Sequence, residues 1–193
     1  IVTGASSGIG RDLALKLAAR GYHCVIMARR ADRLEVLKQE IEALGTVCCH
    51  SVVVDLSDMM AARGAFAEAV GLAREKSWRL EVLANNAGAG EWRPFMSIPI
   101  EKQLATIDLN VKVCTLFTRL FLDEVLGSDR PGYVLNVASM ASFLPVPNYA
   151  VYSGTKAYLR FLNEALNFEL KRTKVSLTCL CPGSTETEFV QAA

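Results

Sequence analysis

The sequence contains very little histidine, which limits both metal binding and hydrolytic catalysis. Only two histidines, His23 and His50, occur among 193 residues. His50 follows Cys48 and Cys49, but neighbouring residues of a strand point to opposite faces and cannot all ligate one metal ion. We therefore predict no metal site.

An excess of charge of either sign is also lacking, as is any long apolar run. The formal net charge is +1, so the chain offers no basic field for nucleic acid. No stretch reaches the ~18 consecutive apolar residues that a membrane span needs. The first residue is Ile1 and not methionine, so we expect the natural chain to start further upstream.

The cysteines are not arranged as a disulfide framework. Five of the six lie in short apolar segments of strand length, a distribution typical of buried thiols in a reducing compartment. This favours a cytoplasmic protein. The six are Cys24, Cys48, Cys49, Cys114, Cys179 and Cys181.

What the sequence does contain is a regular alternation of strand-length apolar runs with longer segments of helical periodicity. Such alternation predicts an α/β fold in which helices cover both faces of a doubly wound parallel sheet. No repeat or long linker interrupts it, so we expect one three-layer domain over residues 1–193. The expected strands are Ile1–Thr3, Tyr22–Ala28, Thr46–Val54, Leu80–Ala84, Tyr133–Ala138 and Val175–Cys181, and the expected helices are Ile9–Arg20, Ala31–Leu44, Asp58–Lys76, Ile100–Leu126 and Tyr149–Arg172.

A glycine-rich turn, T-G-A-S-S-G-I-G, follows the first strand and opens the first helix. Its glycines allow close approach of a ligand, and the free N–H groups of a helix N-terminus suit a pyrophosphate. The spacing differs from the dinucleotide fingerprint G-x-G-x-x-G, and a purely structural turn is the alternative. We predict phosphate binding, with contacts from Gly4, Ser6, Ser7, Gly8, Ile9 and Gly10.

The same turn also fits G-x-S-x-G, the nucleophile elbow of hydrolases, from Gly4 to Gly8. A hydrolase would need an acid and then a histidine later in the chain, after an elbow preceded by several strands. Both histidines lie before position 51, so within this sequence the hydrolase interpretation fails.

Arg29 and Arg30 stand directly after the second expected strand. An acidic residue at this place would bind the ribose 2′-OH of NAD, whereas an arginine accommodates the 2′-phosphate of NADP. A guanidinium donates paired hydrogen bonds to phosphate oxygens. The arginines therefore predict NADP(H). NAD(H), through Asp32, and a merely solvated helix start are the alternatives.

Tyr152 and Lys156 are four residues apart in an expected helix, so their side chains share one face. A phenol has a pKa near 10, and a nearby opposite charge can lower the pKa of an acid by ~1–3 units. Ser139 ends the preceding apolar run and would present its hydroxyl to the same reacting oxygen. Taken alone, the Tyr–Lys spacing equally fits two residues on a solvated helix face.

Two further turns follow expected strands. Asp55 and Leu56 follow the third strand, and N-N-A-G, from Asn85 to Gly88, follows the fourth. Asp55 also suits a helix cap, for which Ser57 is a competing candidate. The N-N-A-G segment also suits an ordinary turn.

Together these segments resemble the short-chain dehydrogenase/reductase family, of its single-domain kind, over essentially the whole chain. Each motif alone is weak, but six in the family's order are specific. They are T-G-x3-G-I-G at Thr3–Gly10, N-N-A-G at Asn85–Gly88, Asn110, Ser139, Y-x3-K at Tyr152–Lys156 and P-G-x3-T at Pro182–Thr187. The resemblance implies a Rossmann-like fold and hydride transfer between a nicotinamide cofactor and a small-molecule carbonyl or alcohol.

The resemblance also implies roles for single residues. Tyr152 would be the catalytic acid/base, Lys156 would lower its pKa and hold the nicotinamide ribose, and Ser139 would bind the substrate oxygen. Asn110 would anchor a proton-relay water, and asparagine is unfavourable inside a helix, which suits a functional exception. Further cofactor contacts are implied for Asp55, Leu56, Asn86, Gly88, Pro182, Gly183, Thr185 and Thr187.

The chain departs from the family at two places. Thr185 stands where a branched apolar residue is usual, and the sequence stops at Ala193, without the family's C-terminal lid, further helix and final strand. The family also implies a homodimer or homotetramer built on the helices expected at Ile100–Leu126 and Tyr149–Arg172.

Substrate chemistry is predicted from apolar residues in the loops after strands four to six. They favour an apolar ketone, aldehyde or 3-oxoacyl-type group over a sugar, although aromatic residues beside a cleft also occur in cores. The alternative function is a non-catalytic NADP-binding regulator or scaffold, which the filled catalytic positions disfavour. The apolar residues are Trp92, Phe95, Phe143, Leu144, Pro145, Val146 and Phe189.

Overall fold

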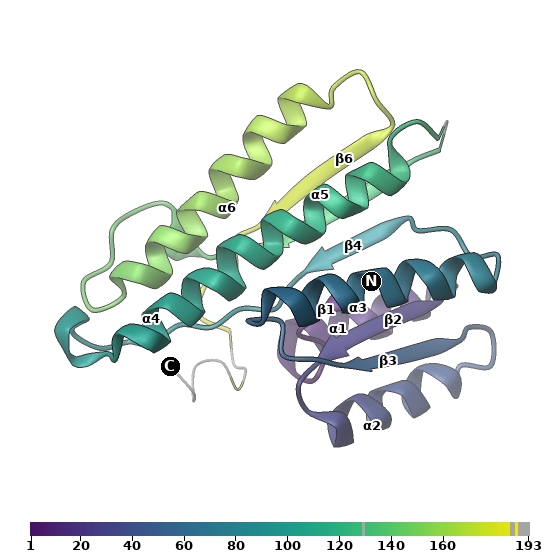
Figure 1. Cartoon of the computed structure of the whole chain (residues 1–193), viewed down its shortest axis with the longest axis horizontal. Helices are drawn as coiled ribbons and strands as arrows, with labels where there is room; N and C mark the ends of the chain where they lie inside the picture. The colour runs from purple at the N-terminus through teal and green to yellow at the C-terminus, as the bar shows by residue number, and fades with distance from the viewer. Residues whose placement is uncertain (129, 186–187, 189–193) are drawn as a thin grey trace.

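The computed structural model of the chain describes residues 1–128, 130–185 and 188. Within them, six parallel strands form one sheet in the order β3-β2-β1-β4-β5-β6 (Figure 1). The order reverses between β1 and β4, which makes the sheet doubly wound. The strands are β1 Val2–Thr3, β2 Cys24–Ala28, β3 Cys49–Val53, β4 Val82–Asn85, β5 Gly132–Val137 and β6 Val175–Leu180.

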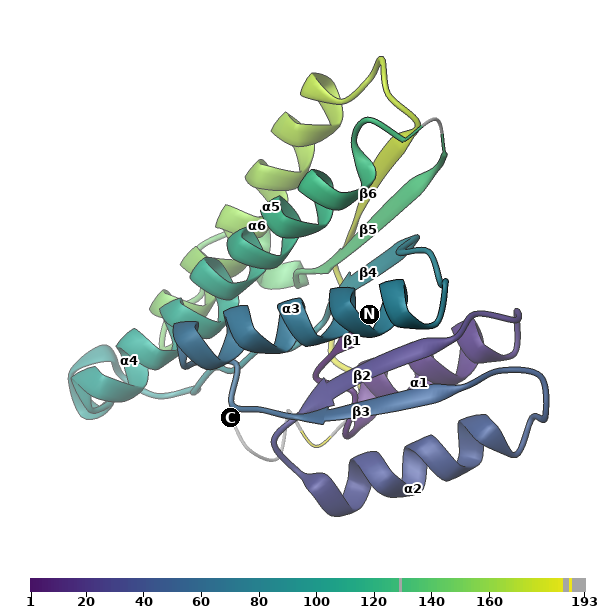
Figure 2. The same cartoon turned by 45° about the vertical axis from the view of Figure 1, so that its right-hand side comes forward.

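Helices cover both faces of the sheet. α1 and α2 pack on one face, and α3, α5 and α6 pack on the other, as right-handed crossovers in both directions from β1 require (Figure 2). No helix in the described part of the chain is both long and apolar enough to span a membrane. The helices are α1 Gly8–Ala18, α2 Ala31–Glu42, α3 Met59–Glu75, α4 Ile100–Ile107, α5 Cys114–Val125 and α6 Ala150–Glu169, with short turns η1 Phe95–Ser97, η2 Asp108–Val113 and η3 Met140–Ser142.

The central strands are buried on both faces, as is usual for parallel sheets. In β2, Val25 and Met27 join the core formed with α3 and α5. The alternate residues Cys24, Ile26 and Ala28 join the core formed with α1 and α2. Because successive side chains point to opposite faces, a slip of one residue would exchange the two cores, and the apolar pattern therefore fixes the register.

A chain of buried carboxamides crosses the sheet near its centre. Asn136 of β5 accepts a hydrogen bond from Asn85 of β4 at 3.0 Å and donates one to Asn163 of α6 at 3.2 Å. Asn163 donates in turn to the Leu177 carbonyl of β6 at 3.4 Å, and Asn85 also donates to Thr118 of α5 at 3.0 Å. These bonds tie three strands to two helices.

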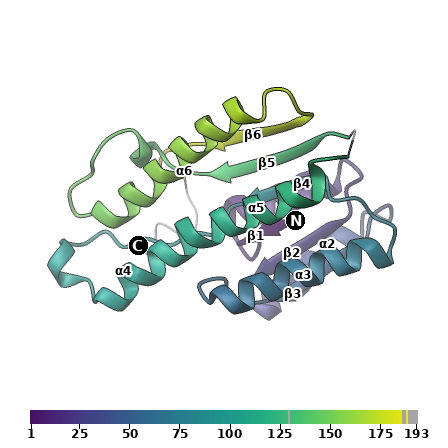
Figure 3. The ribbon, with the colours of Figure 1, turned by 45° about the horizontal axis from the view of Figure 1, so that its top comes forward.

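The expected strands and helices are present, but one long helix is divided. The segment expected to be helical from Ile100 to Leu126 contains the π-helical turn η2 between α4 and α5. Figure 3 shows α4 and α5 running end to end beside α6. The π turn widens the helix at the position of Asn110.

The cap of α3 differs from both candidates proposed from the sequence. Asp58 directly precedes the helix, and its side chain accepts the backbone N–H groups two and three residues on, at 2.8 and 3.2 Å. Asp55 instead closes a turn, accepting from the Ser57 N–H at 2.9 Å and the Ser57 hydroxyl at 2.7 Å. The cap position is therefore occupied by Asp58 and not by Asp55 or Ser57.

Candidate active site

The candidate site lies at the carboxyl edge of the sheet, where β1 and β4 are neighbours and the strand order reverses. In open α/β sheets, ligands bind in the crevice that this reversal leaves between diverging loops. Gly4 follows β1, Asn86 follows β4, and Ser139 lies two residues after β5. The fold therefore gathers residues that are far apart in the sequence.

Tyr152 and Lys156 occupy successive turns of α6 and face the sheet. The Lys156 Nζ lies 5.6 Å from the centroid of the Tyr152 ring and donates a hydrogen bond of 2.8 Å to the Val137 carbonyl at the end of β5. Lys156 is 3% exposed and Tyr152 is 8% exposed. The shared face predicted from the spacing is confirmed, and burial excludes the interpretation as a solvated helix face.

Ser139 reaches Tyr152 from the loop after β5. The two side chains are hydrogen-bonded to each other. The Ser139 Oγ also accepts a hydrogen bond of 3.1 Å from the Ala141 N–H, because Ser139 is the N-cap of η3. This cap fixes the serine hydroxyl beside the phenol.

Burial controls the protonation of both ionisable groups. The pKa of Tyr152 is raised because burial disfavours the phenolate, and the hydrogen bond with Ser139 acts in the opposite direction. Burial lowers the pKa of Lys156 to about 8, an effect opposed chiefly by the nearby thiol of Cys114. Burial of the phenolate is the largest cause of the raised Tyr152 pKa. The effect of Lys156 on the Tyr152 pKa stays a prediction.

Asn110 lies in the π-helical turn and is 1% exposed. Its Oδ1 accepts from the Ala89 N–H at 2.9 Å, and its Nδ2 donates to the Ala89 carbonyl at 2.8 Å and to Thr155 Oγ1 at 3.0 Å. π-helical turns are frequent at functional sites. Here the turn directs Asn110 so that it fastens the segment after β4 to α6. Its role in anchoring a water stays a prediction.

The glycine-rich turn packs tightly against the N-N-A-G turn. Gly4 has a φ of +65°, in the left-handed region, and a Cβ on Gly10 would lie 2.3 Å from the Asn86 Nδ2. The Asn86 Nδ2 donates to the Thr3 carbonyl at 3.0 Å and to the Gly4 carbonyl at 3.2 Å. Asn86, expected as a cofactor contact, therefore uses its amide donors to join the two turns.

Of the two arginines after β2, Arg30 is the one that contacts the glycine-rich turn. Its Nε and Nη2 donate to the Ser6 hydroxyl at 3.1 and 2.9 Å, and its Nη2 donates to the Ser7 hydroxyl at 2.8 Å. Arg29 is exposed and makes no such contact among the described residues. The guanidinium of Arg30 and the hydroxyls of Ser6 and Ser7 therefore lie together beside the N-terminus of α1.

A second arginine, Arg33 of α2, reaches the same place and was not foreseen from the sequence. Arg30 and Arg33 each form an ion pair with Glu188, and the Arg30 pair measures 2.6 Å. These hydrogen bonds, from Arg33 first and then Arg30, lower the pKa of Glu188 to about 2. Because both guanidinium groups converge on one carboxylate, their positions also suit another oxoanion.

The remaining predicted cofactor contacts are distributed between surface and core. Asp55 is exposed, and its bonds with Ser57 lower its pKa. Leu56 is 4% exposed and packs in the core, so its side chain does not line the crevice. Pro182, Gly183 and Thr185 follow β6 at the carboxyl edge, whereas Thr187 and the apolar candidate Phe189 lie outside the described residues.

Two residues that hold the Tyr152 ring were missed. The ring of Tyr149 stacks on it, with centroids 4.2 Å apart and planes inclined by 22°. A Cβ on Gly90 would lie 2.5 Å from the Tyr152 Cδ2, so only glycine fits there. The sequence carried two signals: Tyr149 precedes Tyr152 by three residues, a helical neighbour spacing, and Gly90 closely follows N-N-A-G.

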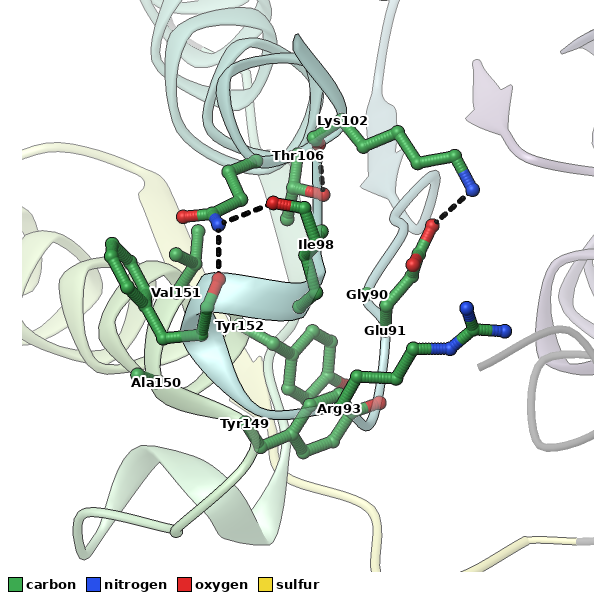
Figure 4. A pocket seen from close by; sticks show the side chains of 12 residues that line it. Gly90, Glu91, Arg93, Ile98, Lys102, Thr106, Tyr149, Ala150, Val151 and Tyr152 are labelled. Atoms are coloured by element: carbon green, nitrogen blue, oxygen red, sulfur yellow. Dashed lines mark hydrogen bonds and ion pairs between the residues drawn. The ribbon is translucent and has the colours of Figure 1, made fainter. Parts of the chain in front are cut away.

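A pocket opens beside Tyr152, between residues 90–98, α4 and the first turn of α6 (Figure 4). Gln103 of α4 fastens its outer segment, because its Nε2 donates to the carbonyls of Phe95 at 2.8 Å and Ile98 at 3.0 Å. Tyr152 therefore lines a small opening between these segments.

The wall of this pocket is mainly apolar and carries three charged side chains. Glu91, Arg93 and Lys102 all line it, together with Tyr149. Of the seven apolar residues expected around the substrate, only Phe95 lines this pocket in the described part of the chain. The pocket therefore has a largely different set of apolar residues, including Ile98 and Val151, from the set expected from the sequence.

The family model for the short chain dehydrogenase matches residues 1–193. The chain belongs to the short-chain dehydrogenase family. Serine 3-dehydrogenase from Rhizobium radiobacter is 32% identical over 190 residues, which cover 98% of this chain and 72% of that protein. As a family member with this fold, the chain is an oxidoreductase with a Rossmann-like sheet.

Solved structures of short-chain dehydrogenases share the fold closely. A metagenomic short-chain oxidoreductase in complex with NADP is 34% identical, with a TM-score of 0.84, over 95% of this chain and 81% of that chain. A short-chain dehydrogenase from Burkholderia phymatum in complex with NAD is 26% identical, with a TM-score of 0.90, over 99% of this chain and 67% of that chain. The neighbours therefore include binders of both nicotinamide cofactors.

Proposed function

We propose that this short-chain dehydrogenase transfers a hydride between NADP(H) and a carbonyl or alcohol substrate. The observation that most directly supports the proposal is the meeting of the Ser139 and Tyr152 side chains beside a pocket, with Lys156 buried behind them. Two such hydroxyls can hold one substrate oxygen and exchange a proton with it.

The glycine-rich turn fits the pyrophosphate of a dinucleotide. Ser7, the N-cap of α1, makes no side-chain cap hydrogen bond, so the first N–H groups of the helix have no side-chain acceptor from their cap. Gly4 and Gly10 have no side chains, which lets the turn pack against the N-N-A-G segment and the start of α1 and fixes its backbone for a ligand. When bound, the cofactor would supply or accept the hydride.

NADP(H) is proposed over NAD(H) because cations gather where the adenosine 2′-phosphate would lie. Arg30 stands directly after β2 and contacts Ser6 and Ser7, and Arg33 converges on the same carboxylate. Guanidinium groups bind phosphate oxygens in pairs. The NADP complex of the metagenomic relative supports this choice.

In the proposed mechanism, Tyr152 gives the proton to the substrate oxygen in reduction and takes it in oxidation. Ser139 holds that oxygen by a hydrogen bond. Lys156, whose pKa of about 8 leaves most of it charged at neutral pH, holds the nicotinamide ribose and favours transient phenolate character. Asn110 anchors the water through which the proton exchanges with solvent.

The relative named serine 3-dehydrogenase supports an alcohol or carbonyl substrate, because serine carries a hydroxyl group. The pocket beside Tyr152 has a mainly apolar wall, which includes Phe95 and Ile98. The apolar ketone, aldehyde or 3-oxoacyl-type substrate predicted from the sequence therefore remains the proposed class.

The proposal is tested by a panel of carbonyl and alcohol substrates with NADPH and NADH, using wild-type protein and Tyr152→Phe. The variant should lose roughly 10²–10⁴ in kcat/KM, because a positioned proton donor contributes about that much. Its Kd for NADPH should stay within about twofold of wild type, since the phenol hydroxyl acts on the substrate.

Tyr133→Phe is the matched control, because Tyr133 lies in β5 and is 44% exposed. It should retain wild-type turnover. Near-normal turnover by Tyr152→Phe would contradict the role of the phenol. Binding of NADPH without consumption across the whole panel would indicate the non-catalytic regulator or scaffold instead.

A further inference from the structure

The carboxylate of Glu188 lies where the 2′-phosphate of the cofactor is proposed to bind. Glu188 comes eight residues after the end of β6, whereas its two ion-pair partners, Arg30 and Arg33, stand at the start of α2, directly after β2. In the sheet, β5, β4 and β1 lie between β6 and β2. The ion pairs therefore link the chain after β6 to the opposite half of the sheet.

The guanidinium of Arg30 is already oriented toward an anion. Its Nε and Nη2 donate to the hydroxyls of Ser6 and Ser7, which leaves Nη1 to donate to one Glu188 carboxylate oxygen at 2.6 Å. Arg33 donates through its own Nη1 to the other oxygen. One carboxylate thus accepts from two guanidinium groups, an arrangement that equally suits the oxygens of a phosphate.

Glu188 and a phosphate cannot both occupy this place favourably. The hydrogen bonds from Arg33 and then Arg30 lower the pKa of Glu188 to about 2, so the carboxylate is ionised at neutral pH. A phosphate monoester carries a charge of about −1.5 to −2. Two guanidinium groups balance the phosphate alone, whereas phosphate and carboxylate together would leave an excess negative charge and repel each other.

The carboxylate is able to leave because its contacts are exposed. The side chains of Arg30, Arg33 and Glu188 are 41%, 43% and 40% exposed. Ion pairs at such positions contribute little free energy, since water and salt screen them. Among the residues that the structure describes, the Glu188 carboxylate has no partner besides these two arginines. Its release therefore breaks no buried contact of the carboxylate, and water solvates the free charge.

We infer that Glu188 competes with the 2′-phosphate of the cofactor: its carboxylate occupies the anion site of Arg30 and Arg33 until a ligand with a 2′-phosphate displaces it. This rests on the proposed binding of NADP(H) and adds a self-inhibitory contact to that site. Glu188 lowers the affinity for 2′-phosphorylated nucleotides and leaves the affinity for nucleotides with a free 2′-OH unchanged.

The competition is tested by calorimetric titration of the full chain with adenosine 2′,5′-bisphosphate and with 5′-AMP, which differ only in the 2′-phosphate. Glu188→Gln keeps the shape of the side chain and removes its charge. It should lower the Kd for the bisphosphate by roughly three- to tenfold, the effect of two exposed ion pairs that no longer compete. The Kd for 5′-AMP should stay within about twofold of wild type.

Two further variants isolate the cause of the gain. Glu124→Gln breaks the exposed pair with Arg74 and changes the net charge equally, so it should leave both Kd values within about twofold of wild type. Arg33→Met removes one of the two cations that Glu188 occupies. In this background the gain from Glu188→Gln should shrink to less than about half, because the two residues act on each other.

Three results would overturn the inference: an unchanged or higher Kd for the bisphosphate in Glu188→Gln, an equal gain for both nucleotides, or a gain that persists in full in Arg33→Met. If wild type and Glu188→Gln both bind the bisphosphate no better than 5′-AMP, the inference and the preference for NADP(H) fail together. The titrations need no turnover. A protein that binds as expected but reduces no carbonyl would refute the proposed reaction and support the competition by Glu188.

Discussion

At the scale of single residues, the buried ammonium of Lys156 lies against the backbone of a glycine, Gly88. A Cβ on Gly88 would lie 3.2 Å from the Lys156 Nζ and 3.3 Å from the Asn110 Oδ1. The bare backbone of Gly88 therefore admits both polar groups. Burying an ammonium disfavours its charged form, which is why the pKa of Lys156 falls to about 8 from an ordinary value of 10.5.

This low pKa predicts that NADPH binding weakens in alkaline solution. Above pH 8 the Lys156 amine of the free protein is mostly neutral, whereas the ribose and the anionic cofactor favour the ammonium, so binding takes up a proton. The Kd for NADPH should then rise by up to roughly tenfold per pH unit above that pKa. Fluorescence titration from about pH 7 to about pH 9.5 measures the slope.

Two lysine variants isolate the cause of this slope. Lys156→Met should bind NADPH more weakly at neutral pH and show a flat profile. Lys76→Met, which removes a lysine that is 51% exposed after α3, should reproduce the wild-type profile. A wild-type Kd independent of pH would show that the charge of Lys156 does not contribute to cofactor binding.

At the scale of elements, the buried carboxamide chain holds the strands beneath the site together. Asn136 is 0% exposed and bonds both Asn85 and Asn163. Since Ser139 lies just after the end of β5 and Tyr152 lies in α6, this chain of carboxamides fixes the two elements that position the hydroxyls. Its loss should therefore affect both stability and catalysis.

Asn136→Leu should destabilise the fold while nearly preserving side-chain volume. Asn85 and Asn163 would each lose a partner in a site without water access, at about 1–3 kcal/mol each. In a chain of this size, that corresponds to a fall in Tm of roughly 4–24 °C. Differential scanning calorimetry measures it, with Gln39→Ala on the exposed face of α2 as the control. A change no larger than that of the control would contradict the structural role.

The strands were predictable because each is a short apolar run bounded by turn residues. The π-helical turn was not, since one extra residue in a turn hardly disturbs the helical periodicity of Ile100–Leu126. The asparagine chain was also missed. An asparagine in an apolar run looks the same whether its carboxamide meets solvent or another buried carboxamide, and only the fold brings Asn85, Asn136 and Asn163 together.

Some residues of the candidate site were also predictable from the sequence and others were not. Ser139, Tyr152 and Lys156 were identified through their spacing and a family resemblance, and the structure brings them together. The contacts of Tyr149 and Gly90 with the Tyr152 ring were missed. They depend on how the segment after N-N-A-G lies against α6, and only the folded chain shows this.

At the scale of the whole molecule, α6 presents apolar side chains to the outside. Phe161 is 62% exposed and Phe168 is 70% exposed. They are seven residues apart and so lie on one side of the helix. Ile100 and Leu104 of α4, 55% and 51% exposed, form a second such pair. Grouped apolar residues on a surface usually mark a contact with another protein.

We expect these helices to pair in a homodimer or homotetramer, as the family resemblance implied. The double variant Phe161→Glu and Phe168→Glu should shift the protein to monomers, because charges would be buried without partners in the contact. Light scattering after size-exclusion chromatography measures the mass. Met60→Glu in α3, where Met60 is 79% exposed, should leave the assembly intact.

The same experiment separates assembly from catalysis. Ala150 begins α6 at the pocket, whereas Phe161 and Phe168 lie three and five turns further along, so removing the partner leaves Tyr152 and Lys156 in the same protomer. A monomeric double variant should therefore keep wild-type kcat/KM within about threefold if each protomer carries a complete site. A monomeric wild type would refute the pairing of these helices, and a monomeric variant without activity would show that the partner's contact is needed to hold α6 against β5.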